Sequence, residues 1–135
     1  MSAGYSGTPL AKKLGIPAGA FATVRAPAHY DALVAPLPDG AKRSARPGKS
    51  PRFVHVFATA RKDLAADLKK LRPILEQDGV VWVSWPKKSA KMDTDITEDT
   101  VRSVALPLGF VDVKVCAVDD TWSGLKLVIR RELRK

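Results

Sequence analysis

The sequence predicts an α/β fold of three layers, with a mostly parallel sheet of about six strands that ends in an antiparallel hairpin. Two apolar runs, residues 53–58 and 80–85, flank a helical pattern over residues 61–77. Leucines recur within that pattern at helical spacing, at Leu64, Leu68, Leu71 and Leu75. A strand, a helix and a second strand in this order indicate a parallel βαβ unit. The last two apolar runs, 111–118 and 125–131, are joined by a turn too short for a crossover, so we expect them to pair antiparallel.

The first part of the chain predicts two short helices and two strands. Thr8 and Pro9 have the pattern of a helix cap and a first helical residue, and Gly15 ends that helix after Leu14. A strand follows over residues 20–25, then a short helix over 29–35 and a weak strand over 41–45. Residues 46–51 form a connector rich in turn residues.

In the second part, Pro73 lies inside the long helical pattern, and we expect it to kink or restart the helix near Leu71. Asp95 followed by Glu98 predicts the start of a last helix, and Gly109 predicts its end. Trp82 and Trp85 fall on opposite faces of one strand, because side chains alternate along a strand.

Composition predicts one domain over residues 1–135. The chain is 45% hydrophobic and 27% charged, and its apolar runs are far shorter than the roughly 20 residues that span a bilayer. Residues 1–5 lack the charged start and apolar core of a signal peptide, and the single Cys116 cannot form an internal disulfide. We therefore expect a cytoplasmic protein that does not associate with membranes.

The net charge of +9 favours an anionic partner. One cluster of cations contains no acid and supplies the candidate nucleic-acid contacts, Lys42, Arg43, Arg46, Lys49 and Arg52. A solvated, soluble surface explains the same cluster, and this simpler interpretation is favoured because no motif of a base-reading protein accompanies the charge.

The order of elements resembles the class I methyltransferase-like Rossmann layout in truncated form. Residues 71–84 resemble the strand before the catalytic loop of those enzymes, and residues 109–113, followed by a tryptophan turn, resemble their C-terminal hairpin. Nearly the whole chain is also similar to a family of small bacterial proteins, domain of unknown function 3052. Residues 4–15, 82–89 and 122–126 carry that similarity, which implies no activity.

The sequence departs from a methyltransferase where the cofactor would bind. Dinucleotide and S-adenosylmethionine sites need glycines after the first strand, and residues 25–30 contain none. Residues 42–48 also lack the acid that would hold the ribose hydroxyls. We therefore expect no bound cofactor.

The carboxyl edge of the predicted sheet is the expected place for a ligand. The candidate anion- or ligand-binding residues at this edge are Arg25, His29, Arg61, Lys87 and Lys88. The alternative is a solvated loop before an acid-capped helix, because Asp93, Asp95, Glu98 and Asp99 are near in sequence.

No catalytic or metal-binding set of residues emerges from the sequence. His55 lies in the middle of an apolar strand and is expected to be a hydrogen-bonded core residue, and Cys116 a buried hydrophobe. Two histidines and one cysteine offer no metal-ligand spacing.

Three functions remain open. The first is a non-catalytic module that binds a small anion or a protein partner on a methyltransferase-like scaffold. The second is a nucleic-acid-binding protein that uses its basic patches. The third is a divergent transferase, which the glycine-free turn disfavours. Enzymatic activity is thus undecided, with the balance against it.

Overall fold

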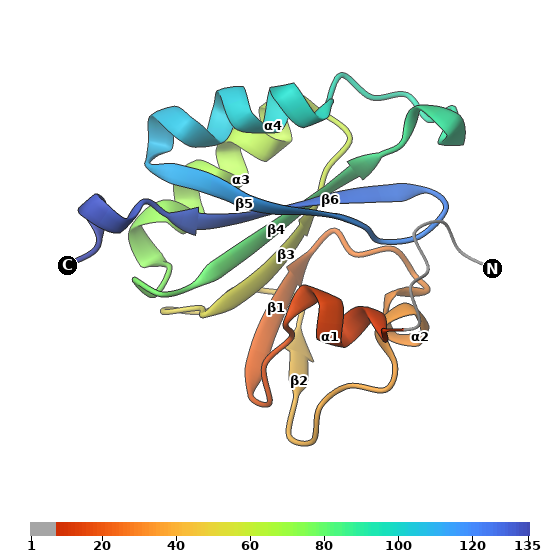
Figure 1. The fold of residues 1–135 in the computed structure, drawn as a ribbon, viewed down its shortest axis with the longest axis horizontal. Helices are drawn as coiled ribbons and strands as arrows, with labels where there is room; N and C mark the ends of the chain where they lie inside the picture. The colour runs from red at the N-terminus through yellow and green to blue at the C-terminus, as the bar shows by residue number, and fades with distance from the viewer. Residues whose placement is uncertain (1–7) are drawn as a thin grey trace.

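A computed structural model describes residues 8–135; residues 1–7, including the start of the family signature at residues 4–15, lie outside the described part. The fold has three layers (Figure 1). Helices α3 (Arg61–Ile74) and α4 (Glu98–Ala105) cover one face of a sheet. Helices α1 (Leu10–Leu14) and α2 (Tyr30–Val34) cover the other face.

The sheet has six strands in the order β2-β1-β3-β4-β6-β5. The strands are β1 (Ala20–Val24), β2 (Lys42–Ser44), β3 (Phe53–Phe57), β4 (Val80–Pro86), β5 (Phe110–Ala117) and β6 (Trp122–Ile129). The first four strands are parallel, and β6 pairs antiparallel with both β4 and β5. The predicted α/β class, the mostly parallel sheet and the closing hairpin are confirmed.

Two details of the predicted helices α1 and α3 differ in the structure. Thr8 is not the cap of α1, because Pro9 takes that position and no side chain caps the helix. Gly15 ends α1 as predicted, in the left-handed conformation at φ +77° that glycine adopts readily. Pro73 does not restart α3, which is a single helix that ends at Ile74. A proline so near the end removes only one of the last backbone hydrogen bonds, so the helix stops there.

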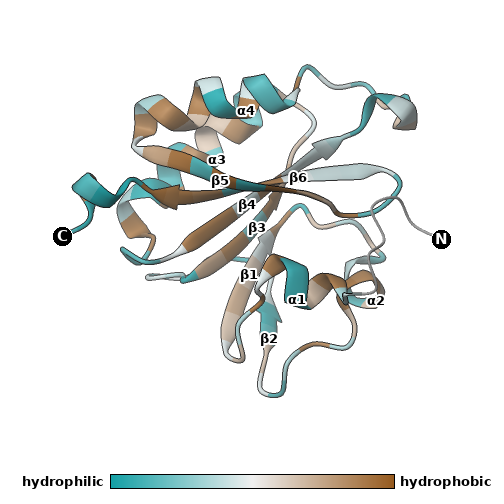
Figure 2. Cartoon of the chain, in the orientation of Figure 1, coloured by the Kyte–Doolittle hydropathy of each residue, from teal (hydrophilic) through white to brown (hydrophobic). Residues whose placement is uncertain are grey.

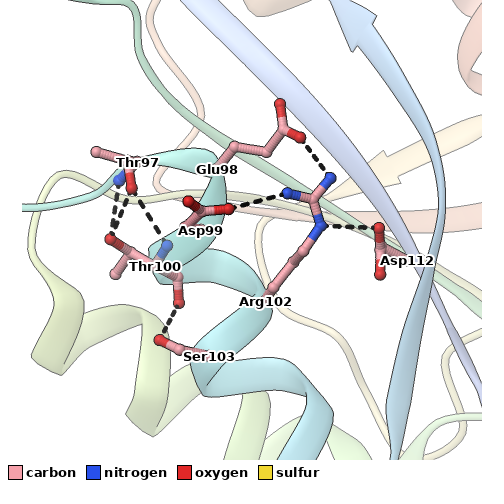
Figure 3. Close-up of polar contacts among 7 residues, drawn as sticks. All are labelled: Thr97, Glu98, Asp99, Thr100, Arg102, Ser103 and Asp112. Atoms are coloured by element: carbon pink, nitrogen blue, oxygen red, sulfur yellow. Dashed lines mark hydrogen bonds and ion pairs between the residues drawn. The ribbon is translucent and has the colours of Figure 1, made fainter.

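The start of α4 also differs from the prediction. Thr97, not Asp95, is the N-cap, and its hydroxyl accepts the Thr100 backbone N–H at 3.2 Å (Figure 3). The Thr100 hydroxyl accepts the Thr97 backbone N–H at 3.0 Å in return. This reciprocal capping box satisfies two donors at once, and Glu98 and Asp99 add the acidic first turn that a helix N-terminus favours.

Apolar side chains from the sheet fill two layers, one on each face. In Figure 2 the strands at the centre of the sheet are largely hydrophobic, whereas the edge strand β2 is hydrophilic. Trp82 is fully buried beneath α1, and its indole N–H donates to the Leu14 carbonyl oxygen at 2.7 Å. Trp85 packs in the opposite layer with α3 and α4, so the predicted alternation of the two rings is confirmed.

The connection from β2 to β3 contains no helix. Because β2 and β3 lie on either side of β1, residues 45–52 cross β1 as a short connector without helix or strand. None of the helices in residues 8–135 has the length and apolar character to cross a membrane.

Candidate functional site

The site is sought where strands β1, β3 and β4 end together. Because these strands are parallel, Val24, Phe57 and Pro86 bring their following loops to one edge of the sheet. The strand order reverses between β1 and β3, because β2 lies on one side of β1 and β3 lies on the other. In open α/β sheets this reversal opens the crevice that binds ligands.

The Arg25 side chain lies across that crevice. Its Nε donates to the Phe57 carbonyl oxygen at 3.0 Å, which ties the end of β1 to the end of β3. Its Nη2 forms an ion pair with Asp67 on α3. Burial raises the pKa of Asp67, although the hydrogen bond and charge of Arg25 oppose this shift. The backbone of Arg25 is left-handed, with φ at 56°, a conformation that costs a residue with a Cβ about 1–2 kcal/mol.

This turn does not fit an adenosyl cofactor. The position where backbone would have to approach a ligand closely holds Arg25, and the guanidinium occupies the gap between the strand ends. Ser44 and Ala45, at the end of β2, carry no carboxylate for a ribose. The turn therefore lacks the glycine and the carboxylate that such a group needs, and the Arg25 side chain, 44% exposed, lies across it.

His29 lies at the same edge and contacts the β5–β6 turn. Its Nε2 is 3.0 Å from Asp119 Oδ2. The other carboxylate oxygen of Asp119 accepts the backbone N–H groups of Thr121 and Trp122, at 2.8 and 2.7 Å. The pair fastens the loop before α2 to the hairpin, 90 residues away in sequence.

A cavity of about 540 Å³ lies beyond the end of β4, within the size range of small-molecule sites. Lys87 and Lys88 line it together with Trp85, Pro86, Met92, Thr94, Ile96, Thr97, Glu98 and Ser123. Trp85 and Ile96 are buried at its base, while Met92 is 42% exposed.

The loop over residues 87–97 forms one wall of this cavity and is fixed at both ends. The Lys87 backbone N–H donates to the Thr121 carbonyl oxygen at 2.8 Å. At the other end, the Thr94 hydroxyl donates to the Thr59 carbonyl oxygen at 2.7 Å. Asp95 accepts the Arg61 backbone N–H at 2.6 Å, so this acid caps the start of α3. Asp95 was expected to cap α4, but its carboxylate accepts a backbone N–H of α3 instead.

The cavity carries two lysines without an acidic partner. In residues 8–135 no carboxylate lies within ion-pair distance of Lys87 or Lys88. Glu98, the one acid of the lining, is paired instead with Arg102 (Figure 3). Arg102 also binds Asp99 at 3.2 Å and Asp112 at 3.0 Å. Arg102 thus shares its single positive charge among three carboxylates, and Glu98 binds Arg102 rather than either lysine of the cavity.

The five predicted site residues share an edge but not one pocket. Lys87 and Lys88 line the same cavity, whereas Arg25 and His29 are engaged with Asp67 and Asp119. Arg61 contributes its backbone to the Asp95 contact, and its side chain is exposed. Sequence reasoning missed Met92 and Ile96 as cavity residues, because a loop without regular structure gives no periodicity to place them.

The basic arm is only partly free to contact a phosphate backbone. Arg43 binds Asp31 through two hydrogen bonds, at 2.7 and 3.1 Å, and lies over the Tyr30 ring. Arg52 binds Asp78 at 2.8 Å. The remaining three members are exposed: Lys42, Arg46 and Lys49. Arg46 and Lys49 also line a cavity of about 510 Å³ at the starts of β1 and β3, at the edge opposite the lysine cavity.

His55 is confirmed as a hydrogen-bonded core residue. Its Nδ1 is 3.1 Å from the Tyr30 hydroxyl, and its Nε2 is 2.8 Å from the Ser84 hydroxyl. All three residues are fully buried, so no substrate reaches the serine. Burial lowers the pKa of His55 to about 3. Cys116 is buried as predicted, and residues 8–135 contain no group of three or more potential metal ligands.

Neither a protein-family model nor a curated protein matches the chain. Solved structures do match its fold. A ribosomal protein L11 methylase from Lactobacillus delbrueckii subsp. bulgaricus superposes with a TM-score of 0.55 at 11% identity, over 90% of this chain and 76% of that one. LepI in complex with SAM superposes with a TM-score of 0.54 at 11% identity, over 90% of this chain.

The chain spans only 39% of the length of LepI and of a second structure, described as a pericyclic reaction enzyme, whose TM-score is 0.56. Identities this low establish shared architecture and nothing of chemistry. Membership in domain of unknown function 3052 remains a prediction. The chain has the methyltransferase-like Rossmann fold, with six strands and the antiparallel hairpin at its end.

Proposed function

We propose that this protein is a non-catalytic binding module on a methyltransferase-like scaffold, and that it binds an anion at Lys87 and Lys88. The proposal is supported by Arg25, whose guanidinium binds the Phe57 carbonyl oxygen and Asp67 across the ends of β1 and β3, where a methyltransferase-like fold would hold a cofactor. The cavity at the same edge lies instead beyond β4.

The electrostatics of that cavity support an anionic ligand. Lys87 and Lys88 both line the cavity, and in the described chain no carboxylate forms an ion pair with either of them. Coulomb attraction therefore favours an anion at this place. A small anion bound there would satisfy both lysines.

The test compares thermal melting in phosphate or sulfate for three proteins. Wild type should gain stability as the anion concentration rises, because a ligand that binds only the folded state stabilises it. Lys87→Ala/Lys88→Ala should lose that gain while melting as wild type does without the anion, since exposed charge changes move stability by less than about 0.5 kcal/mol.

Lys69→Ala/Lys70→Ala is the matched control, because it removes an adjacent lysine pair from the exposed side of α3. It should keep the full anion effect. Equal stabilisation of all three proteins by the anion would refute the site, since the effect would then come from net charge alone.

A second candidate is a divergent transferase, which the architecture shared with the ribosomal protein L11 methylase favours. It requires the adenosyl cofactor to displace the Arg25 side chain. Direct measurement of S-adenosylmethionine binding separates the two candidates.

A further inference from the structure

We infer that the ligand of the lysine cavity is an amphipathic organic acid, with an apolar body against Trp85, Ile96 and Met92 and a carboxylate or phosphate group at Lys87 and Lys88. This inference rests on the proposed anion site and adds the class of ligand. The lining contains both apolar side chains and two lysines, as such a molecule contains an apolar body and a charged head.

The apolar part is provided by two elements that meet at the sheet edge. Trp85 is the next-to-last residue of β4, and Ile96 directly precedes the N-cap of α4; they are 6% and 3% exposed. Met92 extends the same surface and, at 42% exposed, is among the more exposed large apolar side chains in residues 8–135. An unbranched thioether beside an aromatic ring adapts to ligands of different shape.

The polar part offers charge and few free hydroxyls. The Thr94 hydroxyl donates to the Thr59 carbonyl oxygen, and the Thr97 and Thr100 hydroxyls are engaged with each other. A sugar or another ligand that needs many hydroxyl partners would leave its own groups unsatisfied. The ammonium groups of Lys87 and Lys88 and the Ser123 hydroxyl remain as donors, and the two positive charges favour an ionised acid.

The volume also limits the ligand. A cavity of about 540 Å³ corresponds to roughly 18 water molecules at their share of liquid volume, about 30 Å³ each. It therefore has room for one aromatic or short aliphatic acid.

Isothermal titration of the full chain with four probes tests the inference: acetate, phenylacetate, phenyl phosphate and 2-phenylethanol. Phenylacetate should bind at least about tenfold more tightly than acetate, the gain expected when roughly 55 Å² of apolar surface leaves water. 2-Phenylethanol, which has the ring without the charge, should bind more weakly than phenylacetate. The ratio of phenyl phosphate to phenylacetate distinguishes a phosphate head from a carboxylate head.

Variants assign each half of the ligand. Lys87→Ala/Lys88→Ala should weaken phenylacetate at least about tenfold and leave 2-phenylethanol unchanged. Met92→Ser should weaken phenylacetate binding about threefold, because it removes apolar contact with the ring, and should leave acetate binding unchanged. Neither the double lysine variant nor Met92→Ser should affect folding much, because substitutions at exposed positions usually change stability little. Leu106→Ser, at a similarly exposed leucine outside the cavity, is the matched control and should change neither.

The outcomes separate this inference from the proposed function. Equal affinities for acetate and phenylacetate, both lost in the double lysine variant, would keep the anion site and overturn the amphipathic ligand. An unchanged affinity for all four probes in the double lysine variant would overturn both.

Discussion

Arg25 and Asp67, 42 residues apart in sequence, form an ion pair that closes the crevice between the ends of β1 and β3. Two features of Arg25 accompany this ion pair: a second hydrogen bond of its guanidinium and a left-handed backbone conformation. The guanidinium also takes the Phe57 carbonyl oxygen, which β1 no longer reaches after it turns away. The left-handed backbone at Arg25 is maintained by these contacts, because arginine has no intrinsic preference for it.

Arg25→Gly should be more stable than Arg25→Ala by about 1 kcal/mol. Both variants lose the ion pair, but only glycine adopts φ near 56° without a steric cost. Urea denaturation measures the difference. The control is Lys69, an exposed residue of α3, where the order should reverse because alanine favours a helix over glycine by about 1 kcal/mol. Equal stability of the two Arg25 variants would show that the backbone there is not left-handed.

Acidification should destabilise the protein through His55. The folded chain holds this imidazole neutral with a pKa of about 3, against 6.5 for a free histidine. Between these values the unfolded state binds the extra proton, so this contribution to stability is complete above pH 6.5 and is lost as the pH falls below it. The slope is about 1.4 kcal/mol per pH unit at most.

Urea titrations from pH 7 to pH 5 on wild type and His55→Gln isolate this effect. The glutamine keeps a donor and an acceptor for Tyr30 and Ser84 but does not titrate. The free energy of unfolding should fall more steeply with acid in wild type. Parallel pH dependences would place the His55 titration outside this range.

Substitutions of Trp82, which is buried beneath α1, should lower the free energy of unfolding, and Trp82→Ala should lower it more than Trp82→Phe. Trp82→Ala removes a fully buried ring and should cost about 3 kcal/mol or more. Trp82→Phe keeps most of the ring but leaves the Leu14 carbonyl oxygen unsatisfied, and should cost about 1–3 kcal/mol. Guanidinium unfolding measures both, and a cost below about 1 kcal/mol for the alanine variant would contradict the packing.

The fold was predictable because its elements have strong local signals. The leucines of α3 and the apolar runs of β3 and β4 each specify one element, and the short turn before β6 specifies the hairpin. Gly109 was expected to end the last helix, but α4 ends at Ala105, and Gly109 caps the short 3-10 helix Leu106–Leu108 that follows it. The cap of α4 was less predictable, because Asp95 and Thr97 both have capping side chains. The choice between them depends on Arg61, whose backbone N–H takes the Asp95 carboxylate from another part of the chain.

The candidate site was predictable only in outline. The sheet edge and Lys87 and Lys88 followed from strand order and charge. The role of Arg25 did not follow, because its partner Asp67 lies on a different element and the sequence does not reveal a left-handed arginine. The sequence likewise did not show that Arg43 and Arg52 have carboxylate partners, because Asp31 and Asp78 come close to them only in the folded chain.

Nucleic-acid binding, if it occurs through the basic arm, should depend weakly on salt. Of the five cations of this arm, Lys42, Arg46 and Lys49 have no carboxylate partner among the described residues. The log–log slope of affinity against salt for duplex DNA should therefore be about −3, not the −4 to −5 that five contacts would give. Fluorescence anisotropy between low and moderate salt measures the slope. Binding with sequence preference that survives moderate salt would favour the nucleic-acid function over the anion module.

Titration calorimetry of wild type with S-adenosylmethionine and its demethylated product measures whether Arg25 excludes the adenosyl cofactor. Thermal melting gives an independent measurement, because a ligand at 100 times its dissociation constant stabilises the fold by about 2.7 kcal/mol. We expect no binding heat and no shift in melting temperature with either compound at millimolar concentration. A dissociation constant in the micromolar range for either compound would contradict this expectation and would favour the divergent transferase.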